Sequence, residues 1–333
     1  FSKCSQLTSL DVSQFNTNKV SNMKKMFGDC SKLTALDISN FNTDKVINMS
    51  EMFDGCSGLT ALDVTNFNTE NVKDMSEMFR GCSGLTALDV TDFNTAKVTN
   101  MASIFHGCSG LNSLDVSKFN TENIQNMASM FNGCAGLNTL DVSKFNTENV
   151  TNMSSMFNGC AGLNTLDVSK FNTENVTNMA HMFRGCSGLT ALDVSKFNTS
   201  NVTSMYYMFS NCSNVMEITI GSNVETIGFY AFQYLNKITK VIVPDSTTTI
   251  GYSAFRGCSS LTEITLPFVG NYANSSSNPY FGYIFGRDSY SGGLQTTQGN
   301  TYYYIPANLT KVTITNEDIL SNYAFQNCRN LLE

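Results

Sequence analysis

Apolar residues along the first two thirds of the chain follow one pattern that repeats every 26 residues. Residues 7–214 fit eight copies of the motif LxxLDVSxFNTxxVxxMxxMFxxCxx, and nine cysteines from Cys4 to Cys212 keep the same spacing. One copy is too short to bury its own apolar face, so neighbouring copies must stack and join their faces into a continuous core. The pattern therefore predicts a solenoid in which each position of the repeat forms a column.

The first part of each copy has the pattern of a short strand. Leu36 and Ile38 alternate with Asp37, so the two apolar side chains face inward and the carboxylate faces outward. Stacked copies are expected to place these strands in register about 4.8 Å apart. A parallel sheet is therefore predicted along one side of the solenoid.

The second part of each copy has the spacing of a short helix. Apolar residues recur there at intervals of three and four, at Val46, Met49, Met52, Phe53 and Cys56. Asn42 or Thr43 is expected to cap the start of this helix, and Gly55 stands where a left-handed residue would end it. Each coil is predicted to be a strand, a turn, a short helix and a turn back, with the Met and Phe columns in the core.

The repeat changes after residue 214. Val215, Ile238 and Leu261 are spaced by 23 residues, but Leu309 follows only after 48. We interpret residues 1–214 as 26-residue repeats and 215–333 as 23-residue repeats with an irregular insert at 267–308. Together they predict one continuous right-handed α/β solenoid of about 12 coils. Both ends have the sequence of an interrupted repeat, so we expect a fragment of a longer chain.

Composition narrows the possible partners. Apolar residues make up 41% of the chain and charged residues 14%, with a formal net charge of -7. No run of Lys or Arg is present, which argues against nucleic acid and anionic membrane surfaces as partners. No apolar stretch approaches the roughly 20 residues of a membrane-spanning helix, so membrane insertion by this segment is not expected.

Two stretches resemble known bacterial repeats. LTALDVSKFNTSNVTSMYYMF resembles the 26-residue repeat of bacterial surface proteins, and IGYSAFRGCSSLTEITLP is similar to the BspA-like leucine-rich repeat. The insert, with PFVGNY and YFGYIFG, is similar to one found in BspA-like proteins. The resemblance implies a leucine-rich-repeat-like fold and a secreted or cell-surface adhesion role, with no enzymatic activity and no cofactor. A signal peptide and an anchor would then lie outside this segment.

The cysteine column has three interpretations. Each cysteine stands at core spacing beside Met and Phe, where a free thiol serves as a small apolar group. Neighbouring cysteines are also close enough in a stack for disulfides, and soft-metal binding is a third possibility. The lack of CxxC or CxxH pairs favours buried thiols.

An aspartate column is predicted on the outward side of the strands. We expect each carboxylate to accept hydrogen bonds from the backbone or from the Ser or Thr two residues later. A weaker alternative is a strip that binds Ca²⁺. The column comprises Asp11, Asp37, Asp63, Asp89, Asp115, Asp141, Asp167 and Asp193.

Other polar columns offer little chemistry. The asparagines from Asn16 to Asn198 are predicted to form a buried ladder that satisfies the backbone. The histidines, His106 and His181, stand at predicted helix-surface positions of different coils. No nucleophile, base and acid group departs from the repeat, so an enzyme is not expected.

The insert is the predicted ligand-binding segment. It combines tyrosines with Ser, Gly and Asn, a composition typical of antibody paratopes. An alternative is that Phe281, Tyr283, Ile284 and Phe285 form an extra coil that covers the core. The candidate binding residues are Tyr272, Tyr280, Tyr283, Tyr290, Tyr302, Tyr303 and Tyr304.

The leading hypothesis is a surface module that contacts an extracellular protein or glycan through the strand face and the insert. The competing hypothesis is a stalk, spacer or self-associating fibre protein without a ligand of its own. Outward strand positions are small and monotonous, whereas the outer helix positions change from Lys24 and Lys25 to Tyr206 and Tyr207. Binding is therefore expected toward the C-terminal third.

Overall fold

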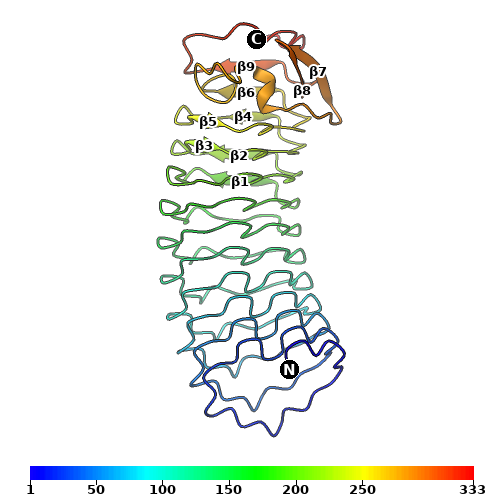
Figure 1. Cartoon of the computed structure of the whole chain (residues 1–333), viewed down its shortest axis with the longest axis vertical. Helices are drawn as coiled ribbons and strands as arrows, with labels where there is room; N and C mark the ends of the chain where they lie inside the picture. The colour runs from blue at the N-terminus through cyan, green and yellow to red at the C-terminus, as the bar shows by residue number, and fades with distance from the viewer. The chain divides into compact units, whose positions relative to one another are not determined.

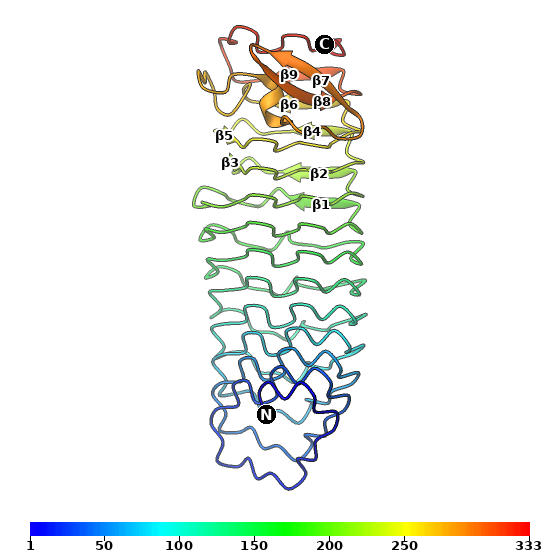
Figure 2. The same cartoon turned by 45° about the vertical axis from the view of Figure 1, so that its right-hand side comes forward.

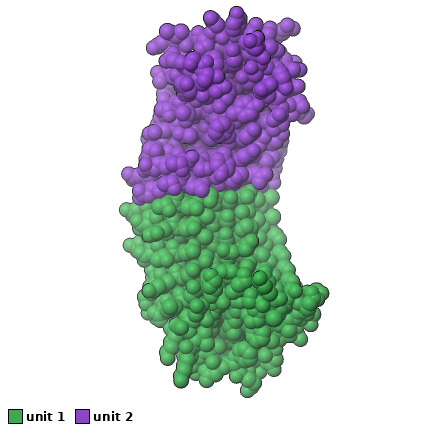
Figure 3. All heavy atoms as spheres, viewed as in Figure 1, with its two compact units in different colours: residues 1–171 green, residues 172–333 purple.

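The computed structural model describes all 333 residues and divides into two compact units, unit 1 (Phe1–Phe171) and unit 2 (Asn172–Glu333) (Figure 3). Within each unit the chain winds in successive coils that lie one above the next (Figures 1 and 2). The stacked-repeat architecture predicted from the period is therefore confirmed. The number of coils, and the assignment of 1–214 and 215–333 to one continuous solenoid, stay predictions.

The core of each unit is built from the predicted columns. In unit 1 the rings of Phe53 and Phe79 lie 5.7 Å apart, and those of Phe105 and Phe131 lie 5.8 Å apart, nearly parallel in both pairs. Every methionine, phenylalanine and cysteine between Val46 and Cys56 is fully buried. The apolar pattern thus identified the inward side chains correctly.

The predicted short helices are wrong. Met52 and Cys56 donate backbone N–H groups to residues three positions earlier, so the segment is a chain of turns. Between these turns Glu51 is left-handed, with φ of 56°, and its N–H donates to Ser76 of the next coil at 2.8 Å. An α-helix needs right-handed φ throughout and bonds to residue i−4, so it cannot form here. Gly55 is left-handed as predicted, with φ of 69°.

The predicted sheet is absent from unit 1. Leu36 and Ile38 are buried and Asp37 is exposed, which confirms the alternation. These residues form no ladder with the neighbouring coil, however. Parallel pairing in unit 1 is limited to single bridges on the turn side, at Asn22–Asn48, Asn48–Asp74, Asp74–Asn100, Asn100–Asn126 and Asn126–Asn152.

Strands form only in unit 2. β1 (Ala191–Val194) pairs in parallel with β2 (Glu217–Ile220). β4 (Lys240–Ile242), β6 (Glu263–Leu266) and β9 (Lys311–Ile314) make a three-stranded parallel sheet. On another side of the coil, β3 (Thr226–Ile227) pairs with β5 (Thr249–Ile250).

The strand-surface side chains also differ between the units. In unit 1 Asp63 stands beside Asp89 and Asp37 of the adjacent coils. In unit 2 the register places Asp193, the last aspartate of the column, opposite Thr219. There Lys240 lies opposite Glu263, with Nζ 3.2 Å from the carboxylate. The ladders thus begin at the coil where the aspartate column ends.

The insert was predicted to be irregular, but it contains regular elements. It contains the 3₁₀ helix η1 (Phe281–Ile284) and an antiparallel hairpin of β7 (Gly293–Gln298) and β8 (Thr301–Pro306). Ser253 donates its N–H to the Tyr283 carbonyl, and Phe281 donates its own to Ala324. Phe281 is fully buried, and η1 takes the place of one turn segment in the stack. This agrees with the alternative prediction that the insert forms an extra coil that covers the core.

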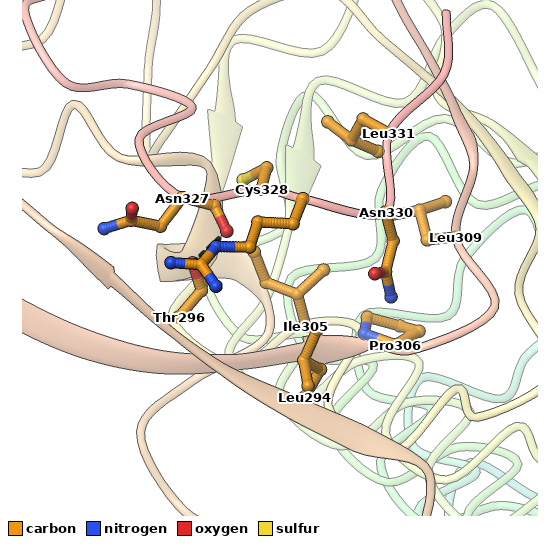
Figure 4. Close-up of a pocket in the computed structure, with 10 residues that line it drawn as sticks. Leu294, Thr296, Ile305, Pro306, Leu309, Asn327, Cys328, Asn330 and Leu331 are labelled. Atoms are coloured by element: carbon orange, nitrogen blue, oxygen red, sulfur yellow. Dashed lines mark hydrogen bonds between the residues drawn. The ribbon is translucent and has the colours of Figure 1, made fainter.

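The hairpin packs against the last coil of unit 2. Figure 4 shows Leu294, Ile305 and Pro306 beside Cys328 and Leu331. The space among them is about 10 Å³, which is room for one water molecule at most. This seam is a packing contact. No helix of the structure is both long and apolar enough to cross a membrane.

Candidate functional site

In each coil two residues lie between the two core methionines, or between the residues that replace these methionines in the 23-residue repeats. The side chains at these two outward positions differ along the chain. In unit 1 they carry Ser, Ala, Glu or Lys, as in Ser76 and Glu77. In unit 2 most of them carry rings, with Ala180, Ser253 and Asn322 as exceptions, and further rings lie on η1 and the segment before it. We call this set the aromatic strip; it comprises His181, Tyr206, Tyr207, Phe229, Tyr230, Tyr252, Tyr272 and Tyr283.

The rings of the strip stack from coil to coil. His181 and Tyr207 have ring centroids 5.2 Å apart with an interplanar angle of 5°, and Tyr207 and Tyr230 are 4.8 Å apart at 9°. Further along, Tyr252 contacts Tyr283 edge to face at 5.4 Å. The second of the two positions has a left-handed backbone in successive coils, so its side chain points in the same direction in each. The distance between coils therefore sets the distance between rings. The strip is a contiguous aromatic surface.

Several residues of the strip are exposed to solvent. Phe229 is 53% exposed, Tyr206 44% and Tyr272 41%. They line a groove of about 310 Å³, in the range of small-molecule sites. The groove also contains Thr, Ser, Gly and Asn and no charged residue; it is lined by residues 203–206, 226–229, 249–251, 271, 272 and 283.

Two buried oxygens at this groove have no hydrogen-bond partner, Ser204 Oγ and Asn271 Oδ1. In other coils the position of Ser204 carries Asn or Asp, which accepts an N–H two residues on, as Asn178 does from Ala180 at 3.0 Å. The shorter serine side chain does not make this bond. Since an unpaired buried polar group is unfavourable, the groove has unused hydrogen-bonding capacity.

His181 lies at the other end of the strip. Burial, and then the nearby Arg184, lower the pKa of His181, and its Nδ1 has no partner. The imidazole is therefore held neutral at pH 7. His106 belongs to unit 1, where burial and Arg80 lower its pKa.

The seven predicted tyrosines do not form one surface. Tyr272 and Tyr283 line the groove. Tyr302 is exposed on the hairpin, where the guanidinium of Arg287 lies 4.9 Å from its ring. Tyr303 is buried, and burial raises the pKa of Tyr290.

The remaining two tyrosines have mainly structural contacts. The Tyr304 carbonyl accepts a hydrogen bond from the Tyr290 hydroxyl at 3.0 Å, and Tyr280 packs 6.3 Å from Tyr303. Ligand binding by any of the seven stays a prediction.

Sequence reasoning missed part of the strip. Tyr206 and Tyr207 were singled out by their departure from the repeat, but Phe229, Tyr230 and Tyr252 were hidden by the change of period. Aligning the two repeat types on their shared Phe column would have placed all five in the same two columns.

The aspartate column has the expected hydrogen bonds. Asp37 accepts the Ser39 N–H at 3.0 Å, and Asp63 accepts both the N–H and the hydroxyl of Thr65. The side-chain and then the backbone hydrogen bond lower the pKa of each carboxyl. No group of three or more His, Cys, Asp or Glu among the 333 residues could hold a metal ion.

The cysteine column from Cys30 to Cys212 consists of buried free thiols, as the favoured interpretation has it, and Cys4 is exposed. The Cys56 thiol donates to the Phe27 carbonyl at 3.1 Å, and the bond recurs along the column. Burial raises the pKa of Cys56 and Cys134 to about 12. These thiols are unreactive core groups.

The predicted buried asparagine ladder is wrong. Asn42 is near the surface and accepts the Asp44 N–H at 3.0 Å, in a local turn. The buried ladder belongs to the next residue of each repeat: Thr43 donates to the Asn68 carbonyl at 3.0 Å and Thr95 to Asn120 at 2.9 Å. A threonine hydroxyl is short enough to reach the neighbouring coil from inside the core.

The strand face carries shallow troughs. In unit 1 a trough of about 670 Å³ runs over Ala35, Leu36 and Asp37 and their counterparts in two further coils. In unit 2 a trough of about 510 Å³ includes the exposed Met216 and Ile242. Binding through this face stays a prediction.

Two protein families match the sequence. One, described as "Mycoplasma protein of unknown function, DUF285", matches residues 1–114, 47–165 and 136–228. The other, described as "BspA type Leucine rich repeat region (6 copies)", matches residues 205–332. No curated protein matches the chain.

Among solved structures, a leucine-rich repeat protein from Bacteroides ovatus is 21% identical with a TM-score of 0.46, covering 80% of this chain and 74% of that one. A leucine rich cell surface protein from Faecalibacterium prausnitzii is 15% identical with a TM-score of 0.35, covering 89% and 76%.

Proposed function

Because the chain belongs to the DUF285 family and carries BspA type leucine-rich repeats over residues 205–332, we propose that it is a non-enzymatic binding module of the cell surface or the extracellular space. The observation that carries this proposal is the aromatic strip of unit 2. Its rings are stacked, partly exposed and contiguous with a groove. Exposed aromatic patches of this kind are typical of interaction sites.

The strip is suited to binding because it is rigid. Ring stacking holds His181, Tyr207 and Tyr230 before a ligand arrives. Inter-coil backbone bonds fix the coils that carry the strip, as where the Tyr207 N–H donates to the Phe229 carbonyl at 3.0 Å. Little side-chain entropy is then lost on binding. Tyrosine with Ser, Thr and Asn also combines apolar contact area with hydrogen bonding.

The test is binding of the purified chain to extracellular-matrix proteins and glycans, beside the variants Phe229→Ala and Tyr206→Ala. Both rings are exposed, so the variants keep the core. Phe15→Ala is the matched control, because Phe15 is 39% exposed and belongs to unit 1, away from the strip. We expect saturable binding that both strip variants weaken and the control retains. Deleting residues 267–308 is a poor test, since it would uncover the buried Phe255.

The second candidate function, a rigid spacer, is favoured by unit 1. Its outward positions are small and repeated, and every coil has the same inter-coil bonds, such as Phe53 N–H to Met78 at 2.9 Å. If the wild-type chain binds nothing in the panel, the spacer hypothesis replaces the binding module. Self-association would then appear in sedimentation as a concentration-dependent size.

A further inference from the structure

We propose that the groove along the aromatic strip binds a neutral carbohydrate chain, through ring stacking at Phe229, Tyr206 and Tyr272 and hydrogen bonds at its floor. This inference rests on the proposed function, because it names the ligand class of the same surface. Three independent features of the groove support it.

The first feature is the exposed aromatic rings. A pyranose ring has an apolar face of polarised C–H groups, which is attracted by the negative face of an aromatic ring. Phe229 and Tyr206 stand at the same position of consecutive coils, and Tyr272 lies on the segment that follows β6. The groove therefore offers successive platforms, which fit a chain of sugar units better than a single one.

The second feature is the unused hydrogen-bonding capacity. Ser204 Oγ and Asn271 Oδ1 are screened from water and have no partner in the protein. Both side chains are half-buried, so rotation of each would bring its oxygen to a sugar hydroxyl in the groove, which would satisfy the oxygen and remove the cost of leaving it unpaired. Threonine hydroxyls of adjacent coils also lie here; Thr249 Oγ1 is 3.3 Å from Thr226 Oγ1.

The third feature is the absence of charge. None of the residues that line the groove carries a formal charge, and the chain as a whole is acidic. A sulfated or carboxylated polymer would find no cation with which to pair, and a basic peptide would find no carboxylate. A neutral glycan needs neither, so it is the occupant that the lining favours.

The experiment titrates the full chain with neutral oligosaccharides, using hexamers of glucose, mannose and N-acetylglucosamine, with heparin as the charged comparator. The chain contains no tryptophan and 13 tyrosines, so tyrosine fluorescence reports stacking on the strip, and calorimetry gives the affinity. We expect at least one neutral hexamer to bind and heparin not to bind. Phe229→Ala should weaken that binding about tenfold and Ser204→Ala severalfold.

Controls separate loss of the site from loss of the fold. Phe229→Tyr keeps the ring and should retain binding, and Phe15→Ala removes an exposed ring of unit 1 and should also retain it. Binding to a matrix glycoprotein before and after enzymatic removal of its glycans tells whether the sugar can be protein-linked. Loss of binding on deglycosylation supports the proposal for that source, and hexamer binding supports it for free chains.

Two results would overturn the inference. In the first, no neutral hexamer binds, but a deglycosylated matrix protein does, and Phe229→Ala abolishes that binding. The proposed binding function then stands, but the ligand is a protein. The other is a neutral hexamer bound equally well by Phe229→Ala and wild type. If nothing binds at all, the inference fails together with the proposed function.

Discussion

The two units have cores of the same kind and different surfaces. Fully buried phenylalanines stack along both, at 5.8 Å between Phe105 and Phe131 in unit 1 and at 5.1 Å between Phe232 and Phe255 in unit 2. The outward positions beside that column are small or charged in unit 1 and mostly aromatic in unit 2. The core columns therefore determine the coil, and the outward pair is free to acquire a function without changing it.

The strand side shows the same division. Unit 1 stacks aspartates and forms no ladder, whereas unit 2 pairs Lys240 with Glu263 and forms one. The strand ladder is therefore present only from the last aspartate of the column onward.

Alkaline pH should destabilise both units, and unit 1 more strongly. Burial raises the pKa of Cys56, Cys134, Cys212 and Cys258 to about 12, above their value of 9.0 when exposed. A raised folded pKa stabilises the fold fully below pH 9 and progressively less as pH rises toward 12, because the unfolded thiols ionise first. Over that pH window each buried thiol lowers the free energy of unfolding by about 1.4 kcal/mol per pH unit.

Urea unfolding between pH 8 and 10.5, with proteolysis to identify the unit that opens, measures this loss. Unit 1 has six buried cysteines, Cys30, Cys56, Cys82, Cys108, Cys134 and Cys160, so it should open first. Cys134→Ala should make the pH dependence shallower. A midpoint that is constant to pH 10.5 would contradict the buried-thiol column.

Phe131→Ala should destabilise unit 1 by about 3–5 kcal/mol, because it opens a cavity in a fully buried ring stack. Phe229→Ala in unit 2 removes the same side chain from a site that is 53% exposed and should cost less than about 1 kcal/mol. Urea denaturation of the two variants measures the difference. Equal losses would mean that the strip is part of the core and not a free surface.

Thr95→Val should cost about 1–3 kcal/mol, although the residue keeps its shape, because the Asn120 carbonyl loses its buried donor. Thr99→Val is the matched control: Thr99 is exposed and its hydroxyl lies 3.4 Å from the Lys73 carbonyl. Thermal unfolding compares the two. If both variants melt together with wild type, the threonine ladder contributes nothing to the stack.

The core could be predicted from the sequence because burial depends on spacing alone. Phe53 and Cys56 are buried whether their segment is a helix or a series of turns, so the apolar period could not separate the two. The left-handed conformation of Glu51 decides between them, and glutamate carries no signal for it. The hairpin of the insert was missed because its strands, GLQTTQ and TYYYIP, lack a clean alternation of apolar and polar residues.

The candidate site was only partly predictable for a related reason. Composition pointed to the tyrosines of the insert, but composition cannot separate a buried ring such as Tyr303 from an exposed one such as Tyr272. Those two differ because β8 faces inward at Tyr303. The groove arises from residues of successive coils, and its unpaired oxygens become visible only when the coils are stacked.

Placing the aromatic strip on unit 1 should change the stability very little, and it tests directly whether the outward side chains account for the difference between the units. Ala102→Tyr with Ser103→Tyr, and Ala128→Phe with Ser129→Tyr, reproduce the two outward positions on adjacent coils. Ser103 and Ser129 already have φ of 58° and 56°, close to the 57° of Tyr207, so the stability should change by less than about 1 kcal/mol.

The grafted chain should bind the neutral oligosaccharide weakly when Phe229→Ala has removed the native platform. Full affinity is not expected, because Asn100 and Asn126 accept the N–H groups of Ala102 and Ala128 and so leave no unpaired oxygen beside the new rings. Tyrosine fluorescence titration measures the recovery. A graft that folds but binds no better than Phe229→Ala alone would show that stacked rings are insufficient and that the unpaired oxygens of unit 2 are required.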